Sequence, residues 1–254
     1  MVKIGNYEIL KQIGEGGFAK TYLAKHVFLD EEACIKQNIN VTKSDGDLLR
    51  REAKMMWNLN HHSLPSVKDF ISLKDGSFAI AMSYAKGNDL EQIVKNKGPI
   101  HPEDVCWITQ RLLQALHYIH AKGTIHSDIK PQNIIVQPKE HNVVLIDYGL
   151  SALRPKGDTT PIGYTQAFAA PELLEGKPPI PESDLYGVGL TMMYALGGDP
   201  VSKSYPKNID GKIKEFCDEL VKYDPMQRPN WEKVDLIKKL SDMRLDVFKR
   251  RYSI

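Results

Sequence analysis

The stretch His126–Gly149 constrains the fold and the chemistry of this chain more than any other. Asp128 and Asn133 lie on a short loop, and two short apolar runs follow before Asp147, which precedes an aromatic residue and a glycine. We expect the two runs to pair as a β-hairpin, which brings two carboxylates and one amide to the same end. Carboxylate and amide oxygens suit Mg²⁺, a cation that keeps several waters and binds substrate phosphates, and Asp128 is placed to accept a proton from an incoming hydroxyl. The pattern therefore predicts magnesium-dependent phosphate chemistry.

The composition is that of an ordinary soluble globular protein. The chain has 254 residues, of which 42% are apolar and 26% charged, and a net charge of +2, which suits one large domain or two compact lobes. So small a charge, with no basic run longer than Lys249–Arg251, argues against a nucleic-acid partner. The lack of a long apolar run or a signal-peptide pattern argues against a membrane. Three widely spaced cysteines fit a reducing compartment, so we expect a cytoplasmic protein.

The motif H-S-D-I-K-P-Q-N, followed by D-Y-G, resembles the catalytic loop and the magnesium loop of protein kinases. A chance match in an unrelated β-hairpin is the plainer alternative, but the separated positions of the motif agree in both type and order. The resemblance implies that the chain uses ATP and magnesium, that Asp128 is the catalytic base, and that Asn133 and Asp147 bind the metal. Lys130 would stabilise the transferred γ-phosphoryl group, and its position is typical of kinases that act on Ser and Thr.

Two strand-like runs near the N-terminus enclose a glycine-rich turn. The turn holds Gly14, Gly16 and Gly17, which allow backbone N–H groups to approach phosphate oxygens with no Cβ in the way. A plain hairpin turn is the commoner explanation for such a sequence. Because it precedes the kinase-like loop, it resembles the nucleotide-binding pattern G-x-G-x-x-G-x-V, with Ala19 in place of the third glycine and Thr21 in place of the valine. Both replacements are small or β-branched, so we expect modest effects on nucleotide affinity.

The run Ala-Cys-Ile-Lys that ends at Lys36 resembles the V-A-I-K strand of kinases. An unpaired ammonium in an apolar strand is costly, so Lys36 needs a phosphate or carboxylate partner; an ordinary surface lysine is the alternative. Glu52 lies on the apolar stripe of a helix expected over residues 45–59. Its place matches the kinase glutamate that pairs with this lysine. We therefore expect Lys36 and Glu52 to form an ion pair, with Lys36 contacting the α- and β-phosphates.

The segment Met82–Ala85 resembles the hinge between the two kinase lobes. By that resemblance Met82 is the gatekeeper, and main-chain groups of Ser83 and Ala85 bind the adenine edge. The implied fold is α+β and bilobal, with a small antiparallel sheet and one helix in residues 1–84, a mainly helical lobe in residues 85–254, and the nucleotide in the cleft between them. The residues expected to contact the nucleotide are Ile13, Gly14, Gly16, Gly17, Thr21, Ala33, Lys36, Met82, Ser83, Ala85 and Ile135.

The second half of the chain is expected to be helical apart from one irregular segment. Apolar periodicity and cap residues predict helices over 90–97, from 102 to about 122, over 182–196 and over 231–248. The segment between Gly149 and the motif Ala-Pro-Glu resembles an activation segment. The resemblance implies that Thr165 contacts the catalytic loop and that Arg228 pairs with Glu172 of this motif. It also implies that Asp184 hydrogen-bonds the catalytic-loop backbone; capping of the helix by Ser183 or Asp184 is the plainer alternative, and both can hold.

Ser127 is the most informative departure from the family pattern. Protein kinases commonly have arginine before the catalytic aspartate, and that arginine pairs with a phosphate on the activation segment. A serine cannot form such a charge-assisted pair. We therefore expect a kinase of the non-RD type, whose activity does not depend on phosphorylation of the activation segment.

The expected substrate is a protein that offers Ser or Thr hydroxyl groups. One alternative is a pseudokinase that acts as a scaffold, against which stands the complete set of kinase residues Lys36, Glu52, Asp128, Asn133 and Asp147. Another is a small-molecule phosphotransferase of the kinase-like superfamily, but those usually lack the Ala-Pro-Glu segment and its distal arginine. The basic tail after residue 248 is either a phosphorylation target or a solvated end, and the sequence indicates no oligomeric state.

Overall fold

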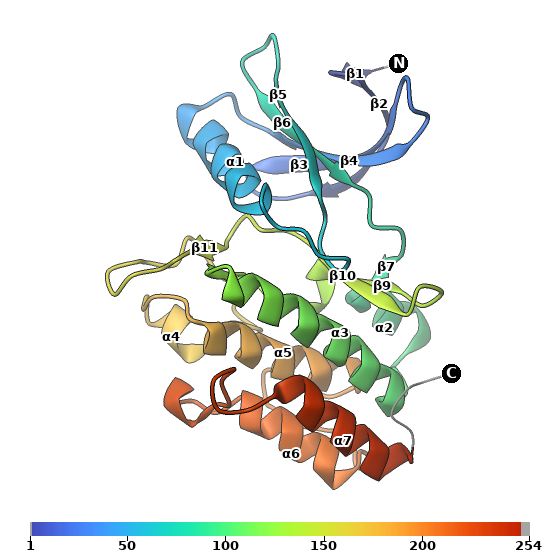
Figure 1. Ribbon diagram of the computed structural model, residues 1–254, viewed down its shortest axis with the longest axis vertical. Coiled ribbons are helices and arrows are strands. Elements are labelled where there is room, and N and C mark those ends of the chain that lie inside the picture. The colour runs from blue at the N-terminus through green and yellow to red at the C-terminus, as the bar shows by residue number, and fades with distance from the viewer. Residues whose placement is uncertain (1, 250–254) are drawn as a thin grey trace. The chain divides into compact units, whose positions relative to one another are not determined.

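The computed structural model describes residues 2–249, so the basic tail expected after residue 248 lies almost entirely outside the described residues. Contacts within the chain divide it into two compact units, one up to Lys86 and one from Gly87 onward. The division falls two residues beyond the expected boundary at 84/85. Figure 1 labels the helices and strands of both units.

The first unit is a six-stranded antiparallel sheet with one helix, α1, packed against it (Figure 1). The strand order is β1-β2-β3-β4-β6-β5. The strands are β1 Lys3–Ile4, β2 Tyr7–Glu15, β3 Ala19–His26, β4 Glu32–Asn38, β5 Val67–Ser72 and β6 Phe78–Ser83. Helix α1, Lys43–Met56, begins two residues before the expected start, because Thr42 caps it by accepting the amide of Asp45 at 3.1 Å.

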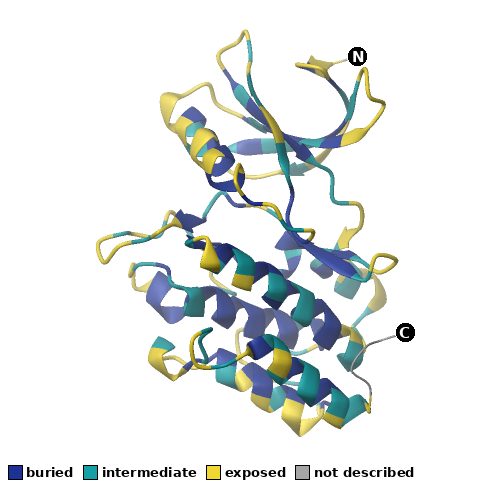
Figure 2. Ribbon diagram, viewed as in Figure 1, coloured by how far each residue is buried: buried dark blue, intermediate teal, exposed yellow. Residues whose placement is uncertain are grey.

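The second unit is mainly helical, with short strands at its edge. Its helices are α2 Leu90–Lys97, α3 Pro102–Ala121, α4 Pro171–Leu174, α5 Pro181–Ala195, α6 Gly211–Leu220 and α7 Leu236–Phe248. Its strands are β7 Asn88–Asp89, β8 Thr124–Ile125, β9 Ile134–Gln137, β10 Asn142–Leu145 and β11 Ala152–Leu153. Helix α5 is apolar on nearly all sides and is buried along almost its whole length (Figure 2), as expected for a core helix.

The hairpin predicted in the stretch His126–Gly149 is present. Strands β9 and β10 pair antiparallel, with Ile134 opposite Leu145. A single turn of 3₁₀ helix, Pro131–Asn133, leads into β9. The hairpin therefore brings Asn133 and the residues that follow β10 to the same end, which is the arrangement that the sequence predicts.

The predicted start of the last helix is wrong. Residues 231–233 form a turn, and α7 begins only at Leu236, after Asp235 caps it by accepting the amide of Lys238 at 2.9 Å. Helix α6 was not among the helices expected from periodicity. The segment between Leu153 and Pro171 contains neither helix nor strand, as expected for an activation segment.

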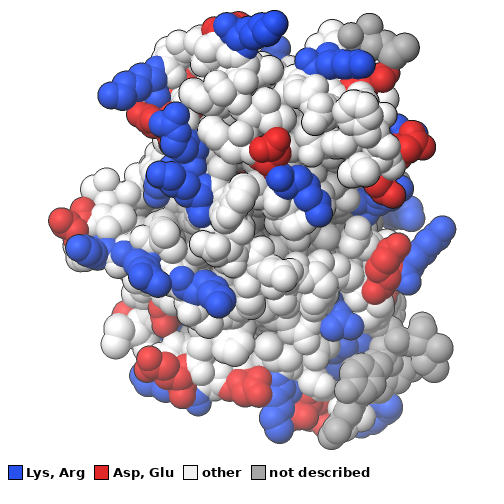
Figure 3. All heavy atoms as spheres, turned by 45° about the horizontal axis from the view of Figure 1, so that its top comes forward, with Lys and Arg blue, Asp and Glu red and all other residues white. Residues whose placement is uncertain are grey.

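Charged side chains of both signs are distributed over the face shown in Figure 3, with acidic side chains next to basic ones at several places. This distribution matches the small net charge of +2. Within residues 2–249, no helix combines the length and the apolar character that crossing a membrane requires.

Candidate active site

The glycine-rich turn between β2 and β3 is closed by a hydrogen bond from the amide of Gly16 to the carbonyl of Ala19 at 2.9 Å. Gly17 lacks the positive φ that favours glycine, and a Cβ built on it meets no atom of the described residues within 4 Å. Neither the backbone nor the packing of the chain therefore requires glycine here. Open space above a backbone amide is what the close approach of a phosphate needs, so this turn fits a nucleotide.

Lys36 of β4 and Glu52 of α1 form the ion pair that the sequence predicts. The Lys36 ammonium lies 2.7 and 2.8 Å from the two carboxylate oxygens. Only 11% of the lysine side chain and 2% of the glutamate side chain are exposed. The ring of Phe18, from the glycine-rich turn, lies 5.6 Å from the ammonium. The pair therefore holds one positive charge in a fixed place beside the turn.

Strand pairing in the sheet places further residues that are expected to contact a nucleotide next to one another. Thr21 of β3 lies opposite Lys36, and Ala33 lies opposite Ser83. The amide of Ser83 is donated to the carbonyl of Ser66 at 2.9 Å. The amide of Ser83 is therefore already hydrogen-bonded within the chain.

The remaining expected contact residues lie in both units. In the first unit, Ile13 of β2 is exposed, Met82 of β6 is buried, and Ala85 is half-buried just after β6. Ile135 belongs to the second unit, where it pairs with Val144 of β10.

In the second unit, the side chains of Thr165 and Lys130 both contact the carboxylate of Asp128. Thr165 donates its hydroxyl to Oδ1 of Asp128 at 2.7 Å, and the Lys130 ammonium lies 2.7 Å from Oδ2. Lys130 also donates to the hydroxyl of Thr165 at 2.8 Å. Asp128 is only 6% exposed, so these contacts fix the direction of its carboxylate. The arrangement places a proton acceptor beside a positive charge.

Asn133 and Asp147 have the chemistry that a magnesium site needs. Asn133 donates its amide group to the carbonyl and to Oδ2 of Asp128, at 2.8 and 3.0 Å, so its own Oδ1 is the atom it can offer a cation. Asp147 is exposed and adopts a left-handed backbone with φ of +66°, a strained conformation that clusters at functional sites. Because Mg²⁺ keeps waters and takes phosphate oxygens, one amide oxygen and one carboxylate from the protein fit its needs.

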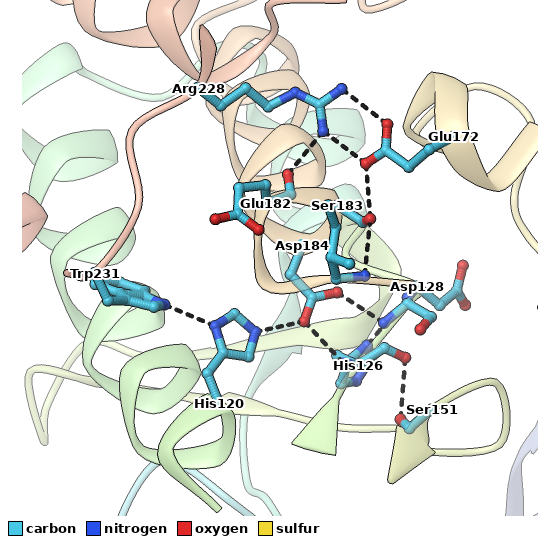
Figure 4. A network of polar contacts seen from close by, with 12 residues as sticks. His120, His126, Asp128, Ser151, Glu172, Glu182, Ser183, Asp184, Arg228 and Trp231 are labelled. Carbon is cyan, nitrogen blue, oxygen red and sulfur yellow. Dashed lines mark hydrogen bonds and ion pairs between the residues drawn. The ribbon is translucent and has the colours of Figure 1, made fainter. Parts of the chain in front are cut away.

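Asp184 of α5 fastens the catalytic loop (Figure 4). Its carboxylate accepts the amide of His126 at 2.8 Å and the amide of Ser127 at 2.7 Å. The helix cap comes from the neighbouring Ser183, which accepts the amide of Ile180 at 3.2 Å. Of the readings that the sequence left open for Asp184, the structure shows the contact to the loop backbone.

His126 connects the catalytic loop to the segment that carries Asp147. Its Nε2 lies 3.1 Å from the carbonyl of Ile146, and its ring meets that of Tyr148 edge-on at 4.9 Å. Nδ1 of His126 accepts the amide of Asp128 at 3.3 Å, so the ring proton is on Nε2 and is donated to the carbonyl of Ile146. Burial lowers the pKa of His126. Ser151 donates its hydroxyl to the His126 carbonyl at 3.0 Å. His126 therefore joins the loop to the segment around Asp147 through its ring and to Ser151 through its carbonyl.

Glu172 and Arg228 form the predicted pair at the end of the activation segment (Figure 4). Two guanidinium nitrogens contact the two carboxylate oxygens at 2.7 and 2.9 Å, and both residues are buried. Ser183 adds a third hydrogen bond to Glu172 at 2.7 Å. Burial alone would raise the pKa of Glu172, but the hydrogen bonds from Arg228 and Ser183 outweigh it and hold the pKa below its usual value.

Sequence reasoning missed two residues that contact this framework. His120 belongs to none of the motifs in the sequence, yet its Nε2 lies 2.7 Å from Asp184. Trp231, expected inside a helix, lies in a turn and donates to Nδ1 of His120 at 2.8 Å. The position of His120 four residues after Leu116, on the apolar stripe of α3, was the available signal for burial.

Comparison with known proteins adds an independent observation. Residues 7–211 match the protein kinase domain family. The chain belongs to the protein kinase family. The expected fold is confirmed with it, because a sheet with one helix and a mainly helical unit are what the resemblance implied.

Three bacterial kinases are among the relatives of this chain. The chain is 34% identical over 205 residues to the serine/threonine-protein kinase pkn3 of Myxococcus xanthus, covering 76% of this chain and 38% of that protein. It is 31% identical over 259 residues to serine/threonine-protein kinase D of Synechocystis sp., covering 89% of this chain and 50% of that protein. It is 30% identical over 203 residues to serine/threonine-protein kinase PrkC of Bacillus subtilis, covering 76% of this chain and 31% of that protein. The chain thus spans half or less of the length of these relatives.

Proposed function

We propose that this chain is the catalytic domain of a serine/threonine protein kinase, which transfers the γ-phosphoryl group of MgATP to Ser and Thr hydroxyls of proteins. The contacts among Asp128, Lys130 and Thr165 carry the proposal, because they place an oriented carboxylate beside an ammonium. The names of the relatives support Ser/Thr specificity. The pair of Glu172 with Arg228 supports a protein substrate, since it anchors the Ala-Pro-Glu segment.

In the proposed reaction, Asp128 accepts the proton of the substrate hydroxyl. Thr165, Lys130 and Asn133 hold its carboxylate in one orientation, so it needs no rearrangement before the proton moves. The ammonium of Lys130 stabilises negative charge that develops next to Asp128 during transfer.

Each unit carries residues whose chemistry suits a part of MgATP. Lys36, oriented by Glu52, would contact the α- and β-phosphates, and the amides of the glycine-rich turn would contact phosphate oxygens. Asn133 and Asp147 would hold the magnesium ion. The bound MgATP supplies the phosphoryl group and the cation that neutralises its charge.

We also propose that activity does not require phosphorylation of the activation segment. In the unmodified chain Thr165 already contacts both Asp128 and Lys130. The small buried side chain of Ser127 replaces the arginine that would pair with a phosphate. Three free cysteines support a reducing compartment, for which we propose the cytoplasm.

Transfer of radiolabelled phosphate to a protein substrate tests the proposal. The variant Asp128→Asn should bind MgATP as the wild type does but transfer phosphate about 10²–10⁴-fold more slowly. Asp147→Asn should also lose magnesium-dependent nucleotide binding, measured as the MgATP-induced rise in melting temperature. Wild-type transfer by Asp128→Asn would refute the proposal, and MgATP binding without any transfer by the wild type would instead indicate a pseudokinase.

Independence from phosphorylation has its own test. Thr159 and Thr160 lie between Gly149 and the Ala-Pro-Glu motif, in the activation segment. Thr159→Ala/Thr160→Ala protein, prepared without any phosphate, should keep near-wild-type turnover. Loss of activity in this variant, with MgATP binding retained, would contradict the proposed independence.

A further inference from the structure

The indole of Trp231 is joined to the catalytic loop through two buried side chains (Figure 4). Its N–H donates to Nδ1 of His120 at 2.8 Å, across 111 positions of the sequence. The other ring nitrogen of His120 lies 2.7 Å from Oδ2 of Asp184. These contacts link the turn before α7 to α3 and to α5.

The chemistry of these groups fixes where the protons lie. An indole nitrogen only donates, so Nδ1 of His120 must be the acceptor and carries no proton. The proton of the neutral ring is then on Nε2, which donates it to Asp184. Only 3% of the His120 side chain and none of the Asp184 side chain is exposed, so water does not compete for either contact. Trp231 therefore selects the one neutral tautomer of His120 that can donate to Asp184.

The carboxylate of Asp184 in turn restrains a strained part of the backbone. Ser127, whose amide it accepts at 2.7 Å, adopts a φ of +68°, which is unfavourable for a residue with a Cβ and persists only where the surroundings enforce it. Asp128 is the next residue. The direction of the catalytic carboxylate therefore depends on how firmly Asp184 is held.

We infer that Trp231 is a positioning residue for phosphoryl transfer, acting through His120 and Asp184 on the backbone of Ser127; this inference rests on the kinase activity proposed above. Trp231 lies beyond the residues 7–211 that match the family, so the restraint comes from the C-terminal part of this chain. The segment that carries it is itself anchored, because Arg228, three positions earlier, is bound to Glu172. The same segment thus holds the end of the activation segment and the catalytic loop.

The variant Trp231→Phe tests the inference, since it keeps an aromatic ring beside His117, which packs against the indole at 5.0 Å, but removes the N–H donor. Its kcat should fall about 2- to 10-fold, the effect expected of one neutral hydrogen bond, with KM for ATP unchanged. Trp107→Phe is the matched control, because that indole donates to Asp104 within the same helix at 3.0 Å and has no contact with Asp184. Its kcat should stay at the wild-type value, and an equal loss in both variants would overturn the inference.

Two measurements without nucleotide separate this inference from the proposed activity. Hydrogen exchange at the amides of His126 and Ser127 should be faster in Trp231→Phe than in wild type, and unchanged in Trp107→Phe. In ¹⁵N-histidine spectra, Nδ1 of His120 should show the chemical shift of an unprotonated, hydrogen-bonded nitrogen in wild type, and this shift should change in Trp231→Phe, while Nε2 stays protonated beside Asp184 in both. Unchanged exchange and an unchanged Nδ1 shift would overturn the inference even if the kinase is active, whereas an inactive wild type would count only against the proposed function.

A double-mutant cycle tests whether Trp231 acts through His120. If Trp231 acts through His120, the loss of kcat in His120→Gln should not increase when Trp231→Phe is added, because coupled residues are not additive. Additive losses would show that the two side chains act separately and would overturn the inference.

Discussion

Thr165 donates its hydroxyl to the carboxylate of Asp128 at 2.7 Å, although the two residues lie 37 positions apart. This bond fastens the end of the activation segment directly to the proposed catalytic base. Because Lys130 bonds to both residues, the segment and the catalytic loop share one hydrogen-bonded triangle. A shift of the segment would therefore turn the carboxylate as well.

We predict that Thr165→Ala lowers kcat by up to about 100-fold, the cost that misplacement of a reacting group can carry. KM for ATP should change little, because Thr165 is not among the residues expected to contact the nucleotide. Thr165→Ser is the matched control, since serine keeps the hydroxyl, and it should retain most of the wild-type kcat. Steady-state kinetics on one protein substrate would check this, and equal activities of the Ala and Ser variants would contradict it.

We predict that Gly17→Ala weakens nucleotide binding without changing stability. Its added Cβ meets nothing within 4 Å in the described part of the chain, so the melting temperature should match that of the wild type. If a phosphate approaches the amide of this residue closely, the methyl group should raise KM for ATP by about 10-fold, the effect of weakening one charge-assisted hydrogen bond.

Gly211→Ala is the matched control for this experiment. Gly211 also has open space at the Cβ position and no positive φ, but it begins α6 in the other unit. The KM for ATP of Gly211→Ala should therefore equal that of the wild type. An unchanged KM in Gly17→Ala would mean that this glycine does not serve phosphate binding.

The parts of the site that were predictable are those encoded by local spacing. The loop and hairpin around Asp128, Asn133 and Asp147 lie within one short stretch, so turn chemistry and strand pairing alone bring them together. The pairing of Lys36 with Glu52 was predictable for a different reason. Each is a charged residue on an apolar face, and burial of one such charge requires the other.

The unpredicted parts depend on contacts between distant segments. His120 lies on an otherwise ordinary amphipathic helix, and nothing near it in the sequence indicates the carboxylate of Asp184. The start of the last helix was misplaced because residues 231–248 have a continuous apolar pattern, while the cap at Asp235 and the bond from Trp231 to His120 set the real boundary. Periodicity reports which face is buried, but it does not report where a tertiary hydrogen bond interrupts the helix.

We predict that the Lys36–Glu52 pair is more important for function than for stability. Lys36→Met leaves the Glu52 carboxylate buried without its cation and should lower the free energy of unfolding by about 3–5 kcal/mol. In Lys36→Met/Glu52→Leu neither side chain of the pair carries a charge, so most of this loss should be recovered while kinase activity stays absent. Urea unfolding measured beside phosphate transfer would check both parts, and a double variant as unstable as Lys36→Met would contradict the explanation.

We predict that the free energy of unfolding falls at acidic pH because Glu172 becomes protonated. Its pKa in the folded protein is held below the usual value of 4.5, so its pair with Arg228 stabilises the fold fully above that pH and loses its contribution as pH falls through the lowered pKa. Glu172→Gln leaves the buried guanidinium without a carboxylate and should cost about 3 kcal/mol at neutral pH. The difference in free energy of unfolding between wild type and Glu172→Gln should therefore shrink steadily below pH 4.5. Glu175→Gln, the control, alters an exposed pair with Lys177, and its free energy of unfolding should stay close to that of the wild type at every pH. If the difference between wild type and Glu172→Gln instead stays constant as the pH is lowered, the Glu172 carboxylate is not the titrating group.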